Sequence, residues 1–315
     1  MAAIALVGTG LIGRAWSISF ARAGHQVRLF DEGAGLAEKA RAFAAEMLPL
    51  LAAEDLLDGQ RADDVAARIR VAASLEEALD GVVHVQESTP EDLEGKKRVF
   101  ARLDRLAPPE TVLASSTSAI LPSLFTEALP GRARCLVVHP INPPYLVPAA
   151  EIVPAPWTDP AVVERTRALV VAAGQAPIVM KRELDGFVMN RMQGALLEEA
   201  FRLVADGYAS VEDVDIGIRE GLALRWSFMG PFETMDLNAP GGIRDYVLRY
   251  QYIYDRLFGS MQRRVDWAGD VLGVAERERR EHLAAGQLAQ RQRWRDRRLM
   301  ALAAHKRRAA RDIGQ

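Results

Sequence analysis

Three polar segments of the sequence lie where short apolar runs end or begin, and their side chains are of kinds that move protons. Ser115–Ser118 follows one apolar run, His139 closes a second, and Glu151 precedes a third. An imidazole can accept a hydroxyl proton near neutral pH, and a carboxylate can hold that imidazole in one tautomer. His139 paired with Glu151 is therefore a candidate general acid/base for alcohol oxidation.

Two further polar residues are suited to hold the oxygen atom of an alcohol beside such a base. Ser118 ends the serine segment, and Asn190 lies in a stretch with helical spacing. Taken singly, each residue also has an ordinary structural interpretation: a hydrogen-bonded histidine at a strand end, a serine turn that caps a helix, and an asparagine on a helix surface. Spacing alone slightly favours these structural interpretations.

A glycine-rich segment near the N-terminus has the spacing of a dinucleotide-binding turn, Gly8-Thr9-Gly10-Leu11-Ile12-Gly13. It follows a short apolar run and opens a helical stretch, so we expect a strand, a tight turn and a helix. Gly8 permits the turn, Gly10 lets the backbone approach a pyrophosphate, and Gly13 lets helix and strand pack closely. The first N–H groups of the helix would bind the phosphate charge.

The acid that follows the second apolar run indicates which cofactor binds. Asp31 closes the run 27–30, where a carboxylate contacts the ribose hydroxyls of NAD and repels the ribose phosphate of NADP. Arg28 lies inside that run and Glu32 follows the acid, so no neighbouring base is placed to reverse the preference. The expected cofactor is NAD, and a glycine turn used only for packing is the alternative.

Apolar runs and helical stretches alternate over the first part of the chain, which predicts an α/β class with a Rossmann-type, doubly wound sheet. The first strand, helix and second strand should form a right-handed parallel crossover. Between Glu32 and Asp80 an Ala/Leu/Glu/Arg stretch, broken near Asp58-Gly59, predicts an inserted helical hairpin. The expected strands cover residues 2–7, 27–30, 82–86, 112–114, 135–139 and 178–180.

Strand patterns stop after Asp185-Gly186, and the remaining sequence has helical spacing. We therefore expect a nucleotide-binding domain over residues 1–185 and an all-α domain over residues 186–315. From about Glu276 the chain is rich in arginine, with an apolar interruption at 299–303. A solvated amphipathic helix explains that segment better than an arm that binds nucleic acid.

Composition and charge favour small-molecule partners. The 315 residues include 40 Lys and Arg against 42 Asp and Glu, a formal charge of −2, so no global field favours a nucleic acid or a membrane surface. The single cysteine, Cys135, lies in an apolar run, which indicates a buried structural thiol in a reducing compartment. Glycines interrupt the first apolar run, which therefore looks like neither a signal peptide nor a membrane span. We expect a cytoplasmic protein without a metal site, since its histidines are scattered.

These motifs, taken together, resemble those of the 3-hydroxyacyl-CoA dehydrogenase superfamily from end to end. Besides the glycine turn and the serine segment, the resemblance is carried by Glu151 and the strings His139-Pro140-Ile141-Asn142-Pro143 and Gly186-Phe187-Val188-Met189-Asn190-Arg191. It implies an NAD-dependent dehydrogenase in which His139 is the general acid/base, Glu151 its partner, and Ser118 and Asn190 contact substrate. It further implies a homodimer formed through the helical domain, and an NAD site lined by Leu11, Ile12, Asp31, Glu91, Lys96, Ser118 and Asn142.

Two features favour a free hydroxy acid over an acyl-CoA. CoA-using relatives present basic residues from the inserted helical stretch, whereas here Asp and Glu outnumber Lys and Arg in that stretch. Arg225 replaces small neutral residues and could pair bidentately with a carboxylate, although an ordinary ion pair explains it equally well. The strings 139–145 and 228–238 are most similar to a branch of the family that acts on L-gulonate. The expected reaction is thus oxidation of the 3-hydroxyl of L-gulonate.

Two alternatives stay open at this point. An enzyme of the same mechanism could act on a 3-hydroxyacyl-CoA such as 3-hydroxybutyryl-CoA, or on carnitine, because specificity depends on pocket details that motifs do not report. The other alternative is a non-catalytic structural protein that binds NAD. That alternative gives no reason for Ser118, His139, Glu151 and Asn190 to occur together, since such polar groups cost stability when unused.

Overall fold

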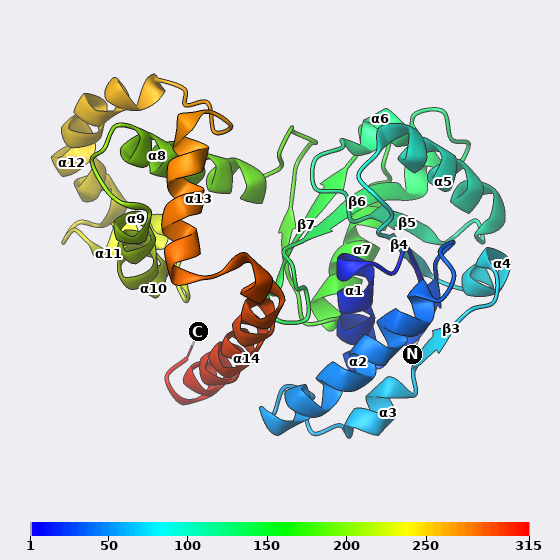
Figure 1. Ribbon diagram of the computed structural model, residues 1–315. Coiled ribbons are helices and arrows are strands. Elements are labelled where there is room, and N and C mark those ends of the chain that lie inside the picture. Colours follow the sequence, from blue (N-terminus) through cyan, green and yellow to red (C-terminus); the bar gives the residue numbers. More distant parts are fainter. Residues whose placement is uncertain (1, 315) are drawn as a thin grey trace. The chain divides into compact units, whose positions relative to one another are not determined.

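The computed structural model describes residues 2–314, and eight strands within them form one sheet (Figure 1). The strands are β1 (Ala3–Val7), β2 (Gln26–Phe30), β3 (Ile69–Val71), β4 (His84–Glu87), β5 (Val112–Ser115), β6 (Cys135–Pro140), β7 (Ala149–Pro154) and β8 (Ala176–Val179). Their order across the sheet is β3-β2-β1-β4-β5-β6-β7-β8. Neighbouring strands run parallel except β6 and β7, which are antiparallel.

Helices cover both faces of this sheet. They are α1 (Leu11–Arg22), α2 (Leu36–Ala53), α3 (Ala62–Ala66), α4 (Leu75–Leu79), α5 (Leu93–Leu106), α6 (Pro122–Thr126), the short turn η1 (Arg132–Arg134) and α7 (Pro160–Ala172). Successive side chains of β1 point to opposite faces of the sheet and belong to two core layers, Ile4 and Leu6 to one and Ala5 and Val7 to the other. Helices α1, α2, α3 and α7 pack on the first side, and α4, α5 and α6 on the second. The predicted doubly wound α/β class is confirmed.

All six expected strands are present with small shifts at their ends, but two more strands were not predicted. β3 is short and carries an exposed arginine, Arg70, at its centre. β7 contains Glu151, which we expected at the edge of an apolar run; that expectation is wrong, because Glu151 lies inside the strand. A carboxylate within a buried strand breaks the apolar pattern that predicts strands, and it needs hydrogen-bond partners to be stable there.

The inserted helical hairpin is confirmed, although it is shorter than the stretch that predicted it. The connection between α2 and α3 contains three residues with positive φ, namely Asp55, Asp58 and Gly59. The chain therefore turns where the sequence indicated a break. After α3 the same stretch forms β3 and α4, so only its first part is the hairpin.

The described residues divide into two compact units. One contains the chain up to Asn190 together with Asp296–His305, and the other contains Arg191–Arg295 and the residues from Lys306 on. The second unit is helical, as the loss of strand patterns predicted. The helical elements after β8 are α8 (Met189–Ala205), α9 (Val211–Ile216), η2 (Gly217–Leu222), α10 (Ala223–Trp226), α11 (Pro231–Leu237), α12 (Gly242–Phe258), η3 (Ser260–Gln262), α13 (Asp270–His282), η4 (Ala285–Gln287) and α14 (Leu288–Asp312).

The arginine-rich end of the chain forms two helices, α13 and α14, rather than one. Met300 and Ala304 of α14 are buried in the core of the α/β unit, with Leu299 and Ala303 packed beside them. The expectation of a solvated helix is therefore wrong for the middle of α14, where apolar residues recur at helical spacing. No helix between residues 2 and 314 combines the length and apolar character needed to cross a membrane.

Candidate active site

The turn after β1 has no room for a side chain at two of its three glycines. Gly8 has a φ of +87°, and a Cβ atom there would lie 2.6 to 2.7 Å from backbone atoms of Ser88 and Thr89. A Cβ atom on Gly13 would lie 2.0 Å from the carbonyl oxygen of Gly8. At Gly10, by contrast, no atom of the described chain comes within 4 Å of such a Cβ. The space in front of Gly10 is therefore open to a ligand.

Helix α1 begins directly after this turn. Gly10 is its N-cap and has no side chain to bind the first N–H groups of the helix. Leu11 is more than half exposed at this end, whereas Ile12 packs on the core. Unpaired N–H groups beside an open glycine turn attract an anion, so the turn fits the pyrophosphate of a dinucleotide.

Asp31 follows β2, and its carboxylate reaches back to the glycine turn. Oδ2 accepts hydrogen bonds from the N–H (2.7 Å) and the hydroxyl (3.0 Å) of Thr9, and Oδ1 accepts one from the N–H of Gly33 (2.9 Å). These bonds fix the carboxylate at the carboxyl end of the sheet. A carboxylate in this place can accept hydrogen bonds from ribose hydroxyls and repels a ribose phosphate.

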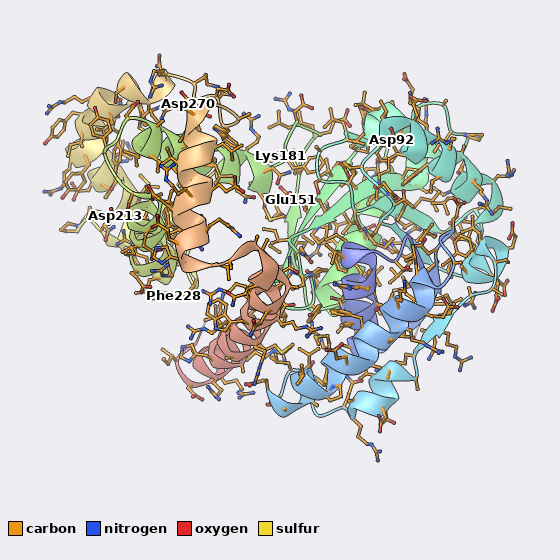
Figure 2. All side chains as sticks on the ribbon, viewed as in Figure 1. Asp92, Glu151, Lys181, Asp213, Phe228 and Asp270 are labelled. Carbon is orange, nitrogen blue, oxygen red and sulfur yellow. The ribbon has the colours of Figure 1, made fainter. Side chains whose placement is uncertain are left out.

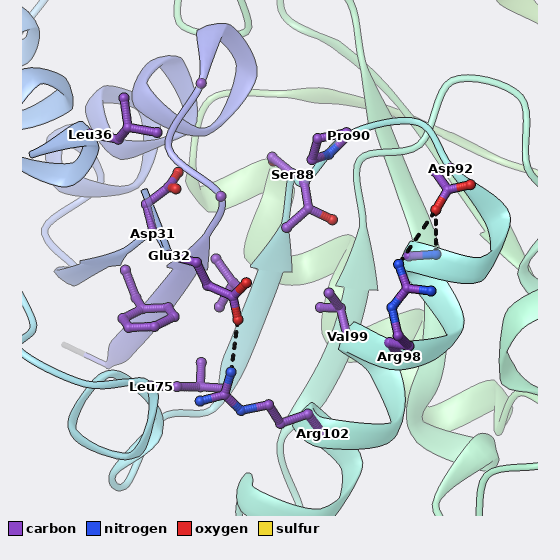
Figure 3. A pocket seen from close by; sticks show the side chains of 16 residues that line it. Asp31, Glu32, Leu36, Leu75, Ser88, Pro90, Asp92, Arg98, Val99 and Arg102 are labelled. Atoms are coloured by element: carbon purple, nitrogen blue, oxygen red, sulfur yellow. Dashed lines mark hydrogen bonds and ion pairs between the residues drawn. The ribbon is translucent and has the colours of Figure 1, made fainter. Parts of the chain in front are cut away.

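A cavity of about 700 Å³ opens beside Asp31 (Figure 3). Its lining includes the glycine turn, the loop after β4 and the apolar side chains of Phe30, Leu36, Leu75 and Val99. An apolar slot next to an acid and an anion-binding turn suits an adenosine group, whose ring is flat and whose ribose is polar. The cavity therefore extends the dinucleotide site.

Two arginines of α5 also line this cavity, and the sequence alone did not indicate them. Arg102 forms an ion pair with Glu32 at 2.8 Å, and Arg98 lies 3.8 Å from Asp92 (Figure 3). Both are far from Asp31 in sequence, and only the pairing of β1 with β4 brings α5 to the cavity. Because an acid neutralises each arginine, Asp31 keeps the local charge negative, which agrees with NAD rather than NADP.

His139 and Glu151 form a buried pair near the carboxyl end of β6. They lie directly opposite each other on antiparallel β6 and β7, and His139 Nδ1 is 2.7 Å from Glu151 Oε2. Their side chains are 7% and 0% exposed, and Figure 2 labels Glu151 on β7. Among residues 2–314, Nε2 of the imidazole has no hydrogen-bond partner. The carboxylate therefore holds a proton on Nδ1 and leaves Nε2 able to accept one.

The second oxygen of Glu151 binds the start of α8. Oε1 accepts hydrogen bonds from the N–H groups of Val188 (2.6 Å) and Met189 (2.9 Å). The chain reaches this position through Gly186 and Phe187, which both have positive φ, 73° and 51°. The buried Phe187 ring also lies 5.5 Å from the imidazole. This turn thus orients the carboxylate that orients the histidine.

The segment around Ser118 is held from two sides. Asn190 donates a hydrogen bond from Nδ2 to the carbonyl oxygen of Ser118 at 2.6 Å. Glu91 Oε1 accepts hydrogen bonds from the N–H groups of Ser118 and Ala119, both at 3.1 Å, and from the Thr117 hydroxyl. The structure therefore brings three predicted site residues, Ser118, Asn190 and Glu91, into direct contact within the α/β unit.

Lys96, another predicted site residue, is enclosed. Its side chain is 1% exposed, and Nζ donates to Glu87 Oε1 (2.7 Å) and to the carbonyl oxygen of Thr89 (3.0 Å). The sequence did not single out Glu87, although a charged residue at the end of an apolar run was a possible signal. Asn142, by contrast, is exposed just after β6.

Arg225 is the predicted site residue that belongs to the second unit. It lies on α10, and its side chain is exposed. Among the described residues it forms no ion pair, unlike Arg102 or Arg134, which both have carboxylate partners. Its guanidinium therefore keeps its full set of donors for another group.

Burial excludes two other titratable side chains from proton transfer at neutral pH. Burial lowers the pKa of His84 to about 4 and raises the pKa of the Cys135 thiol to about 12. His84 is then neutral and Cys135 un-ionised, so neither is prepared to act as an acid or a nucleophile. Within residues 2–314 no three His, Cys, Asp or Glu side chains are grouped so as to hold a metal ion.

Comparison with protein families identifies both parts of the chain. The NAD-binding domain of 3-hydroxyacyl-CoA dehydrogenase matches residues 3–183, and the C-terminal domain of 3-hydroxyacyl-CoA dehydrogenase matches residues 186–270. The cofactor predicted from the glycine turn and Asp31 is thereby confirmed as NAD.

Individual relatives agree with this assignment. The chain is 41% identical over 308 residues to the lambda-crystallin homolog of Bos taurus, covering 95% of this chain and 94% of that protein. It is 42% identical over 236 residues to L-carnitine dehydrogenase of Streptomyces griseus, covering 74% and 69%. Among solved structures, the NAD+-dependent 5-formyl-3-hydroxy-2-methylpyridine 4-carboxylic acid 5-dehydrogenase has a TM-score of 0.82 at 26% identity, covering 98% of both chains. The chain belongs to the 3-hydroxyacyl-CoA dehydrogenase family and is an NAD-dependent oxidoreductase.

Proposed function

We propose that this enzyme oxidises the 3-hydroxyl group of a small, free 3-hydroxy acid, with L-gulonate as substrate and 3-dehydro-L-gulonate as product. The observation that carries the proposal is the 2.7 Å contact between His139 Nδ1 and Glu151 Oε2. A buried carboxylate on one ring nitrogen makes the other a base of fixed orientation, which alcohol oxidation requires.

In the proposed reaction the substrate loses the hydrogen on its carbon as a hydride and its hydroxyl hydrogen as a proton. NAD, when bound, supplies the hydride acceptor. His139 Nε2 takes the hydroxyl proton, and Glu151 stabilises the imidazolium that forms. We assign Ser118 and Asn190 to the substrate oxygen, because the hydrogen bond from Asn190 Nδ2 to the Ser118 carbonyl oxygen brings the loop after β5 and the start of α8 together.

The same proposal assigns the NAD site to residues around the glycine turn and the adjoining strand ends. Gly10 faces open space and Asp31 stands beside it, so these two have the geometry to touch the cofactor directly. Glu91 and Lys96 bind other parts of the chain, which supports a role in shaping the site as well as lining it. The full set is Gly8, Gly10, Leu11, Ile12, Gly13, Asp31, Glu91, Lys96, Ser118 and Asn142.

The helical insertion supports a free acid over an acyl-CoA. Arg68 donates to the carbonyl oxygen of Ala21 (2.7 Å) and to the side chain of Gln60 (2.6 Å), and Arg61 lies 3.7 Å from Asp63. Arg68 is thus engaged within the chain, the Arg61–Asp63 contact is exposed and weak, and the excess of acids in this stretch disfavours a polyphosphate.

We further propose that Arg225 binds the carboxylate of the substrate. Its guanidinium is exposed and, within residues 2–314, free of ion pairs, which suits bidentate pairing with a carboxylate. Two of the similar enzymes, the L-carnitine and pyridine 4-carboxylic acid dehydrogenases, are named for substrates that carry a carboxylate. The second candidate substrate is therefore L-carnitine, favoured by the 42% identity to its dehydrogenase.

A homodimer formed through the helical unit is also part of the proposal. Large apolar side chains are exposed there, among them Phe228 (71%), Phe232 (73%) and Leu248 (78%). Figure 2 labels Phe228. Exposed apolar patches of this kind mark protein interfaces, and sedimentation equilibrium should give twice the chain mass of 34.6 kDa. A monomer at micromolar concentration would contradict the dimer.

We propose the cytoplasm as the compartment, because the single cysteine is buried and unpaired.

The test of the proposed substrate is NADH formation with L-gulonate, L-3-hydroxybutyrate, L-carnitine and 3-hydroxybutyryl-CoA, compared by kcat/KM. We expect L-gulonate to exceed each of the others by about 10-fold or more, since a site built for a polar substrate rejects analogues that leave its groups unpaired. A higher kcat/KM for L-carnitine or for the CoA ester would overturn the substrate assignment. NADH formation with none of the four would contradict the proposed reaction.

A further inference from the structure

A buried ion pair lies next to the cofactor cavity and has no part in the proton transfer described above. Glu87 ends β4 and is 0% exposed, and Lys96 on α5 is 1% exposed, with 2.7 Å between Oε1 and Nζ. Removing two charges from water costs stability, and apolar residues of similar size often pack as well or better. Stability alone is therefore a weak explanation for this pair.

Both oxygens of the Glu87 carboxylate are occupied by hydrogen bonds. Oε1 accepts from the N–H and the hydroxyl of Thr89, each at 2.5 Å, in addition to Lys96. Oε2 accepts from the hydroxyl of Ser115 at 2.6 Å. Ser115 ends β5, and its oxygen in turn accepts the N–H of Thr117 at 3.2 Å. One carboxylate thus fixes the turn after β4 and the start of the serine segment.

The turn held by this carboxylate is a wall of the cofactor cavity. Ser88, labelled in Figure 3, and Thr89 line the cavity. The N–H of Ser88 donates to the carbonyl oxygen of Val7 at 2.7 Å. A Cβ on Gly8 would lie 2.6 Å from the carbonyl carbon of Ser88 and 2.7 Å from the nitrogen of Thr89. This peptide therefore packs directly on the first glycine of the dinucleotide turn. A shift of Thr89 would change the width of the pyrophosphate site.

We propose that Glu87 is a positioning residue for NAD: it fixes Thr89, and through Thr89 the wall that faces the glycine turn. Lys96 balances the charge of the buried carboxylate. The proposal rests on NAD binding alone, so it stands or falls independently of the substrate.

The test compares Lys96→Met with the double variant Glu87→Met/Lys96→Met, using thermal unfolding and NADH binding followed by fluorescence. Lys96→Met leaves a buried carboxylate without its counterion, whereas replacing Glu87 as well removes that charge but leaves the N–H and hydroxyl of Thr89 without an acceptor, so the two variants should have similar unfolding temperatures. If Glu87 also positions the wall, the double variant should bind NADH about 10-fold more weakly than Lys96→Met. A loss of NADH affinity without a loss of stability between the two variants is not expected from a purely structural pair. An NADH Kd within about twofold of that of Lys96→Met would overturn the proposal.

A matched control and a milder variant keep this test decisive. Asp104 and Arg134 form another buried pair, at 2.9 Å, outside the cavity lining. Arg134 also donates to the backbone carbonyl oxygens of Pro108 and Asp104, so Asp104→Asn/Arg134→Met should lower the unfolding temperature and leave the NADH Kd unchanged. If the double variant at Glu87 does not fold, Ser115→Ala removes one hydrogen bond to the carboxylate without changing charge. It should weaken NADH binding about threefold, and an unchanged Kd would contradict the proposal.

Discussion

His139 on β6 and Glu151 on β7 are directly opposed residues of antiparallel strands, and their side chains meet at 2.7 Å. Because β7 runs antiparallel to β6, a residue in the middle of β7 lies opposite one near the carboxyl end of β6. Backbone pairing between the strands then sets the distance between the two side chains. The sheet thus places the imidazole beside the carboxylate, and the N–H groups of Val188 and Met189 orient that carboxylate.

Glu151→Gln should lower kcat while leaving cofactor binding intact. The carboxylate accepts from the imidazole and from the N–H groups of Val188 and Met189, whereas a Gln amide must direct its NH2 group at one of these donors. The preferred tautomer of His139 is then lost, and we expect kcat to fall by a factor on the order of 10²–10⁴. Steady-state kinetics and NADH fluorescence measure the two quantities. A kcat within threefold of the parent value would show that the pair is not needed.

Gly8→Ala and Gly10→Ala should separate folding from cofactor binding. A Cβ at Gly8 collides with the Ser88-Thr89 backbone, and its φ of +87° disfavours alanine, so we expect a loss of at least ~2 kcal/mol of stability. A Cβ at Gly10 meets no described atom of the chain but projects where a pyrophosphate would approach. Gly10→Ala should unfold at the parent temperature and bind NADH at least ~10-fold more weakly. Parent-like NADH binding by Gly10→Ala would place the cofactor elsewhere.

Asp31→Ser/Glu32→Gln should allow the enzyme to bind NADPH. The first change removes the carboxylate that repels a ribose phosphate, and the second frees Arg102 from its 2.8 Å ion pair. We expect the Kd for NADPH to fall by about 10-fold or more relative to the parent, because a freed guanidinium can bind the phosphate bidentately. Adding Arg102→Met should abolish the gain. An NADPH Kd that does not respond to Arg102→Met would exclude this arginine from the site.

His84 should make the fold less stable in acid. Burial lowers its pKa from the ordinary 6.5 to about 4, so the unfolded chain binds the proton more readily than the folded chain. The free energy of unfolding should therefore fall by ~3 kcal/mol in total as the pH is lowered from about 6.5 toward 4. Urea unfolding at several pH values in this window measures the loss, and His84→Gln should reduce it. Burial also lowers the pKa of His25, but His25 is present in the parent protein and in the His84→Gln variant alike. The same pH dependence of stability in parent and variant would show that His84 is not the cause.

The sequence predicts best the features that local patterns encode. The glycine turn, the six apolar strands and the helical second unit all follow from spacing within a few residues. β3 and β7 escaped prediction because a charged residue interrupts each of them, Arg70 in one and Glu151 in the other. Polar residues inside a strand are explained only by the partners that the folded chain supplies.

Long-range pairing accounts for the site features that the sequence did not indicate. Arg98 and Arg102 reach the cavity because α5 follows a strand that neighbours β1, and Glu87 acquires its role from contacts with Thr89, Lys96 and Ser115. Apart from the contact of Glu87 with Thr89, two residues later, these contacts join parts of the chain that local sequence patterns do not connect.

The most direct test of the account is the turnover of His139→Gln with saturating NAD and L-gulonate. Glutamine keeps the size and polarity of the side chain but cannot accept the hydroxyl proton as a base. We expect kcat to fall by a factor on the order of 10²–10⁴, with the NADH Kd and the unfolding temperature close to the parent values. A variant that retains near-parental kcat would contradict the assignment of His139 as the base, and with it the proposed mechanism.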